Sequence, residues 1–185
     1  MLILLLALSP LECKSRAHRP RKLGDFRNQR RWLNPCLAWH SYLVATIAFL
    51  PETDCINTVS TQVSLAVTPL VISPPSESVR WVTHVASQLA STAEPLILVF
   101  HGETSVHAPA IGFSRRSLRR PAVGYVLIDP VMPTIGGDYG DWPDAPVTVV
   151  ITDSANELAK EASLQSRLRG WKVTTDSPQE VLSAL

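Results

Sequence analysis

The sequence predicts an α/β protein: an incomplete doubly wound parallel sheet over residues 64–185, preceded by an irregular N-terminal segment over residues 1–63. Three observations predict this fold class. From residue 64 on, short apolar runs alternate with segments of helical periodicity, which is typical of parallel strands joined by crossover helices. The apolar runs have little polar alternation, as in strands covered on both faces. Polar or glycine-containing residues follow most runs, where such folds place their loops.

Composition separates the two parts and excludes some classes of protein. All three cysteines lie in the first 55 residues, whereas seven of the eight glycines lie at Gly102 or later. The hydrophobic fraction of 45% excludes an intrinsically disordered protein. The net charge of +1 excludes a globally basic protein, so no specific nucleic-acid partner is predicted. Because the cysteines are too far apart for a CxxC metal site, we expect reduced thiols, no metal, no cofactor and a cytoplasmic location.

The N-terminal segment combines apolar and basic stretches. Residues 1–11 are apolar but far shorter than the ~20 residues of a membrane helix, and the parts of a signal peptide are incomplete. Eight of the 17 basic residues lie in residues 14–31, which fits a solvated basic arm or a surface for anionic lipid or an acidic partner. Residues 37–50 are apolar over a length that fits a buried helix or an interfacial segment. The alternatives for residues 1–50 are therefore a solvated arm and a membrane or partner contact.

The first regular elements are expected between residues 64 and 120. Residues 64–73 (SLAVTPLVIS) are apolar and β-branched, which favours a buried strand, and two prolines end it. Ser76 can cap a helix over about residues 77–90, which has apolar residues at helical spacing. Residues 96–100 (LILVF) are the next strand, and a less regular helix follows over about residues 108–120. Its end carries four arginines, for which a solvated helix end is expected: Arg115, Arg116, Arg119 and Arg120.

Three further strands and two helices complete the predicted pattern. The strands are expected at residues 122–128, 146–152 and 171–175. Two Ser-x-x-Glu capping boxes, at Ser154 and Ser177, begin the helices, and Gly170 ends the first of them. The loop over residues 132–145 is rich in glycine and aspartate, but its spacing matches neither an EF-hand nor a phosphate-binding loop.

Doubly wound sheets form their sites at the carboxyl ends of the strands. Candidate site residues therefore lie in His101–Ser105 and Asp129–Pro133, and at Asp153 and Asp176. These segments hold the side chains from which a binding or catalytic site is expected.

Four stretches match one enzyme family in their order along the chain and in the apolar character of their strands: PLILVFHGET (95–104), GYVLIDPVMP (124–133), WPDAPVTVVIT (142–152) and GWKV (170–173). Together they resemble the C-terminal part of small bacterial α/β-hydrolases. The resemblance implies that residues 95–104 lead into the nucleophile elbow and that Asp153 occupies the position of the triad acid. In a second register, residues 96–102 resemble the earlier strand of that family, which ends in His-Gly and supplies an oxyanion-hole amide.

The family's catalytic motif is incomplete in this chain. The elbow of the family is Gly-x-Ser-x-Gly, and Gly102 stands where the serine belongs. No histidine follows His107, although the family places its base near the C-terminus. Ser105 is left as a displaced nucleophile, with His101 or His107 as base and Asp153 as acid. Alternatively, Ser105, Thr104 and Glu103 cap the helix that follows the strand.

Three functional hypotheses result. The first is an α/β-hydrolase-like protein without normal serine-hydrolase catalysis that binds a small ligand or a partner at the remaining cleft. Its ligand-contacting residues are expected to be Gly102, Glu103, Thr104 and Asp129. The second is an active carboxylic-ester hydrolase that uses Ser105, and the third is an interaction protein anchored through residues 1–50. An exposed sheet edge also predicts that the chain forms oligomers, and the change of composition also fits a mis-assigned translation of the N-terminal segment.

Overall fold

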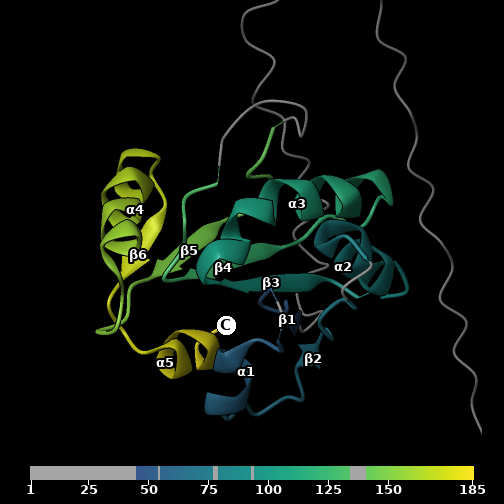
Figure 1. The fold of residues 1–185 in the computed structure, drawn as a ribbon, viewed down its shortest axis with the longest axis horizontal. Helices are drawn as coiled ribbons and strands as arrows, with labels where there is room; N and C mark the ends of the chain where they lie inside the picture. Colours follow the sequence, from purple (N-terminus) through teal and green to yellow (C-terminus); the bar gives the residue numbers. More distant parts are fainter. Residues whose placement is uncertain (1–44, 54, 77–78, 93, 134–140) are drawn as a thin grey trace, which may run out of the picture. The chain divides into compact units, whose positions relative to one another are not determined.

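The computed structural model describes residues 45–53, 55–76, 79–92, 94–133 and 141–185. Six parallel strands form one sheet in the order β2-β1-β3-β4-β5-β6, and Figure 1 shows helices on both sides of it. The strands are β1 (Thr46–Phe49), β2 (Leu70–Val71), β3 (Leu96–His101), β4 (Gly124–Ile128), β5 (Val147–Val150) and β6 (Lys172–Thr174). The predicted α/β class with a parallel sheet is confirmed.

Five α-helices and one 3-10 helix occur in the described residues. They are α1 (Thr58–Gln62), α2 (Trp81–Ala90), η2 (Gly102–His107), α3 (Ala108–Ser117), α4 (Glu157–Leu168) and α5 (Pro178–Ser183). In Figure 1, α2 and α3 cover one face of the sheet, and α1 and α5 lie on the other. No helix of the described residues has the length and apolar character needed to cross a membrane.

The central strands are buried on both faces because their side chains alternate between two cores. Leu96, Leu98 and Phe100 of β3 belong to the core beneath α2 and α3. Ile97 and Val99 belong to the second core, which α1 and α5 cover with Val59, Val181 and Leu182. This explains why the sequence of β3 is apolar without alternation.

Strand β1 corrects the prediction for residues 37–50, which was a buried helix or an interfacial segment. Thr46–Phe49 instead pairs with both β2 and β3 near the centre of the sheet. An apolar run of this length does not distinguish a buried strand from a helix by periodicity. The described part of residues 1–63 therefore contributes β1 and α1 to the α/β fold. Residues 1–44, with the apolar start and the basic run, lie outside the described residues.

Several predicted element bounds change. Of residues 64–73 only Leu70–Val71 forms a strand, at the sheet edge, because much of this stretch is exposed and Pro69 has no amide to donate. Helix α4 is capped by Asn156, whose side chain accepts from the amide of Ala159, rather than by Ser154. The capping box at Ser177 and the left-handed Gly170 after α4 are confirmed. The glycines at 136, 137 and 140 lie outside the described residues.

The expected solvated arginine cluster is wrong for Arg115. Its side chain is only 1% exposed, and it donates hydrogen bonds to the carbonyl oxygens of Leu89 (2.8 Å), Thr92 (2.9 Å) and Glu94 (3.3 Å). These carbonyls belong to the end of α2 and to its connection to β3, where helix carbonyls lack partners in a following turn, so Arg115 supplies donors to this helix end. The residue joins α3 to α2 and has a structural role.

Candidate functional site

The order of the strands determines where a site can form. Strands β1 and β3 are neighbours in the sheet. From β1 the chain continues to β2 on one side of this pair, and from β3 it continues to β4 on the other side. Ligands of doubly wound proteins bind at such a switch point, outside the carboxyl ends of the strands. Here the switch point lies between the segment that follows β1, which contains Glu52, and the segment that follows β3, which begins at Gly102.

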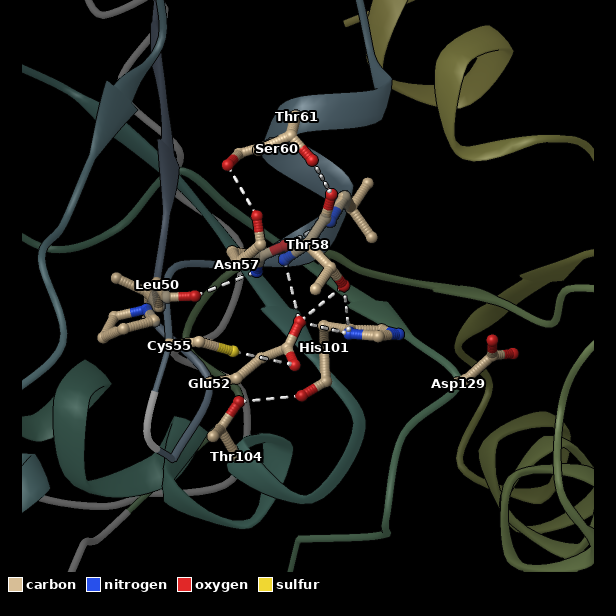
Figure 2. Close-up of polar contacts among 12 residues, drawn as sticks. Leu50, Glu52, Cys55, Asn57, Thr58, Ser60, Thr61, His101, Thr104 and Asp129 are labelled. Atoms are coloured by element: carbon tan, nitrogen blue, oxygen red, sulfur yellow. Dashed lines mark hydrogen bonds and ion pairs between the residues drawn. The ribbon is translucent and has the colours of Figure 1, made fainter.

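The side chains of Glu52 and His101 are in hydrogen-bonding contact at this switch point (Figure 2). The Nδ1 atom of His101 lies 2.9 Å from Oε1 of Glu52. The same carboxylate oxygen accepts hydrogen bonds from the amide (2.8 Å) and the hydroxyl (2.6 Å) of Thr58. The two side chains are about one quarter exposed, at 25% for Glu52 and 27% for His101. The carboxylate of Glu52 therefore fixes the orientation of the His101 ring, and the hydrogen bonds from Thr58 fix the carboxylate.

Helix α1 supplies the groups that hold Glu52. Asn57 is fully buried, and its side-chain oxygen accepts from the amide of Val59 and so caps α1. Its side-chain nitrogen donates to the carbonyl of Leu50 at 2.9 Å. The cap thus fastens the start of α1 to the end of β1, which brings the amide of Thr58 to Glu52.

These contacts also change the acidity of Glu52. Burial by itself raises the pKa of this carboxyl group. The hydrogen bonds from the hydroxyl and the amide of Thr58, and the hydrogen bond and charge of His101, outweigh burial and lower the pKa to about 2. Glu52 is therefore anionic at neutral pH, the state that orients the Nδ1–H tautomer or the protonated form of His101.

Gly102 makes the sharp turn between β3 and η2. Its φ of +59° lies in the left-handed region that favours glycine. A Cβ atom built there meets no atom within 4 Å, so the glycine is required by backbone conformation rather than by space. The hydroxyl of Thr104 donates to the carbonyl of His101 at 2.9 Å and closes the turn.

Asp129 links the ends of the next two strands. It follows β4 with a φ of 43°. Its Oδ1 atom accepts from the amide of Thr152 at 2.8 Å, and its Oδ2 atom accepts from the hydroxyl of the same residue. Asp129 thus has a positioning role at the cleft, and Asp153 beyond it is exposed.

Three adjoining clefts lie along this edge of the sheet. The cleft we call the His101 cleft has a volume of about 430 Å³ and is lined by His101, Thr58, Asp129, Thr152, Asp153 and Ser154, among others. The turn cleft, of about 300 Å³, is lined by Glu52, Thr53, His101, Gly102, Glu103 and Thr104. The Trp81 cleft, of about 360 Å³, is lined by Trp81, Glu103, Val106, His107, Val131 and Leu158. In Figure 2, the ring nitrogen of His101 that is not bound to Glu52 points toward the side on which Asp129 lies.

The structure brings together most of the predicted site residues. His101, Asp129 and Asp153 line the His101 cleft, and Gly102, Glu103 and Thr104 line the turn cleft. Ser105 is different, because it is 0% exposed and its hydroxyl has no hydrogen-bond partner within the described part of the chain. It lines none of these three clefts.

Sequence reasoning missed Glu52 and Thr58. Glu52 lies three residues after the end of β1. The rule that sites follow strands would have found it once residues 46–49 had been assigned as a strand. No group of three or more potential metal ligands occurs among the described residues. No family model, curated protein or solved structure matches this chain.

Proposed function

We propose that this chain is an α/β-hydrolase-like binding protein that holds a small polar ligand in the His101 cleft and performs no serine-dependent acyl transfer. The observation that carries this proposal is the orientation of His101. Glu52 fixes its Nδ1 atom, and the opposite end of the ring points toward the Asp129 side (Figure 2). Such an imidazole offers a ligand one hydrogen-bonding atom at a defined position.

The hydrolase-like part of the proposal is supported by the turn at Gly102. A nucleophile elbow is a strained turn between a strand and a helix, and Gly102 has a left-handed conformation between β3 and η2. In this register, residues 95–104 lead into the elbow. The other register would make β3 an earlier strand of the family.

The absence of serine chemistry is supported by the side chains at the turn. Glycine at position 102 has no atom that can attack a carbonyl carbon. Ser105, the displaced candidate, is completely buried and lies in no cleft with His101. Nucleophilic catalysis requires a nucleophile and a base within hydrogen-bonding reach of each other. What remains at this edge is the ability to recognise a ligand.

The lining of the His101 cleft indicates the kind of ligand. Hydroxyl groups of Thr58, Thr152 and Ser154 lie around it together with Asp129 and Asp153. These groups bind hydroxyl or amino groups by hydrogen bonds, and the volume of about 430 Å³ is within the usual range for small-molecule sites.

A thermal-shift screen tests the binding. The full chain is screened against small polyols, amines and carboxylates, because a ligand that binds only the folded state raises Tm. We expect hits whose shift is lost in His101→Ala and retained in His84→Ala. His84 is a matched control because it lies on α2 and bonds to Ser73 (3.0 Å) outside the clefts. A screen in which no hit loses its shift in His101→Ala, or a screen without any hit, would contradict the proposal.

Reaction with a fluorophosphonate tests the catalytic part. We expect the intact mass of the protein to stay unchanged after treatment, in the wild type and in Ser105→Ala. An adduct on the wild type that disappears in Ser105→Ala would contradict the proposal and support the ester-hydrolase alternative.

A further inference from the structure

The Trp81 cleft has a more apolar lining than the neighbouring His101 cleft. Side chains of Val106, Val131 and Leu158 make its walls apolar, and Val106 and Leu158 are 40% and 58% exposed. Trp81 and His107 contribute a pair of stacked rings, with centroids 5.0 Å apart and planes inclined by 27°. Aromatic and aliphatic walls of this kind bind the apolar part of a small molecule.

Trp81 is held in place by the segment that follows β1. Its indole nitrogen donates to the carbonyl of Pro51 at 3.2 Å and is 3.4 Å from the carbonyl of Glu52. The ring is therefore connected to the same segment that positions the Glu52–His101 pair. A fixed indole ring offers a large flat surface to the apolar body of a ligand.

The described lining of the Trp81 cleft contains one carboxylate, that of Glu103. Glu103 lines both the Trp81 cleft and the turn cleft, and no described lysine or arginine pairs with it. None of the described residues that line the three clefts is a lysine or an arginine. Burial lowers the pKa of His107, which favours the neutral imidazole beside Trp81. A cleft with one carboxylate, and with no lysine or arginine among the described residues of its lining, attracts positive ligands.

We infer that the Trp81 cleft binds a small organic amine, with its apolar body against Trp81 and its ammonium group at Glu103. The inference deepens the proposed function, since it assigns a ligand class to the apolar part of the same edge of the sheet. The aromatic wall selects the body of the ligand, and the carboxylate selects its charge.

Three probes with the same aromatic body test this inference: 2-phenylethylammonium, 2-phenylethanol and 3-phenylpropionate. Binding to the full chain is measured by NMR on the indole N–H signal of Trp81, which is assigned with Trp81→Phe. We expect the ammonium to bind about fivefold more tightly than the alcohol, which corresponds to about 1 kcal/mol for a partly exposed cation site. The carboxylate is expected to bind most weakly.

Two substitutions separate charge from shape. Glu103→Gln is expected to reduce the affinity for the ammonium to that for the alcohol, and to leave the alcohol unchanged. Glu161→Gln, an exposed change on α4, is the matched control and should change neither affinity. Trp81→Ala removes the indole signal, so binding to this variant is followed on the backbone amide signal of Glu103, which lines the same cleft. We expect it to bind both probes about tenfold more weakly, with folding verified by circular dichroism. An ammonium affinity that is unchanged in Glu103→Gln, equal affinities of ammonium and carboxylate, or no binding of any probe would overturn the inference.

The variant His101→Ala distinguishes this inference from the proposed function. Ammonium binding that persists in His101→Ala supports the Trp81 cleft, whatever the thermal-shift screen reports for the His101 cleft. Ammonium binding that is lost in His101→Ala but retained in Glu103→Gln would place the amine in the His101 cleft. That result would overturn this inference and leave the proposed function standing.

Discussion

Two regions of the molecule use their polar side chains in opposite ways. In the α3 contact (Gly112, Arg115, Tyr125, Trp142 and Asp144), polar groups bind one another or the backbone inside the packed core. The hydroxyl of Tyr125 donates to Asp144 at 2.6 Å, and burial, together with this carboxylate, raises the pKa of Tyr125. At the carboxyl edge (Glu52, His101, Gly102, Glu103 and Asp129), side chains line clefts instead. The first region stabilises the fold, and the second is available for binding.

Arg115→Met should produce the largest loss of stability. The substitution removes the side-chain donors to the carbonyls of Thr92 and Glu94, and one of the donors to the carbonyl of Leu89, at a position that is almost completely buried. We expect the free energy of unfolding to fall by about 3 kcal/mol in a urea titration. Arg80→Met, at an exposed position with no capping hydrogen bond from its side chain, should change it by less than about 0.5 kcal/mol. Equal effects of the two substitutions would contradict the structural role of Arg115.

Gly112→Ala should have the next largest effect, because α3 lies close to the aromatic pair below it. A Cβ atom at position 112 would lie 2.5 Å from the hydroxyl oxygen of Tyr125 and 2.9 Å from Trp142. Overpacking of this kind costs about 2 kcal/mol of unfolding free energy. Gly124→Ala is the matched control, since its Cβ would meet nothing closer than 3.7 Å. A stability of Gly112→Ala at or above that of the wild type would show that the ring pair can shift.

Gly102→Ala tests the carboxyl edge by backbone strain alone. The position has a positive φ and open space around a Cβ, so the expected loss is about 1 kcal/mol, without a packing contribution. Gly102→Asn should lose about half as much, because asparagine tolerates the left-handed conformation better. The comparison is made by thermal and urea unfolding. A greater loss in Gly102→Asn than in Gly102→Ala would indicate a steric cause.

The smallest effect on the free energy of unfolding is expected when the pH is lowered and Glu52 is protonated. The pKa of Glu52 is about 2 in the fold against an ordinary value of 4.5, so folding favours its ionised form. Its contribution is fully present above about pH 4.5 and is lost as the pH falls toward 2. Because the pair is partly exposed, we expect a contribution of about 1 kcal/mol or less. The difference in unfolding free energy between the wild type and Glu52→Gln should therefore shrink between pH 5 and pH 2. A constant difference would contradict the lowered pKa of Glu52.

Features that depend on local chemistry could be predicted from the sequence. Strands β3 and β4 are apolar on both faces, and the cap at Ser177 and the glycine at position 170 act within a few residues. The positions of His101, Gly102 and Asp129 at strand ends followed from the parallel fold. These predictions needed only periodicity and the polarity of single segments.

Features that depend on distant contacts could not be predicted in the same way. Glu52 meets His101 across 49 residues of sequence, and nothing near either residue indicates the partner. The sequence predicts that Arg115 belongs to an exposed, basic helix end. The prediction fails because the packing of α3 against the end of α2 is a distant contact that the local sequence does not indicate. The burial of Ser105 likewise depends on how η2 turns after Gly102.

NMR mapping of a bound ligand tests the central claim most directly. The isotopically labelled full chain is titrated with the strongest hits of the thermal-shift screen, and amide and histidine-ring signals are followed. We predict that the shifts concentrate at Glu52, Thr58, His101 and Asp129, and that they disappear in His101→Ala while the spectrum of the folded protein remains. Saturable shifts confined to other parts of the molecule, with the ring signals of His101 unmoved, would contradict the assignment of this cleft as the binding site.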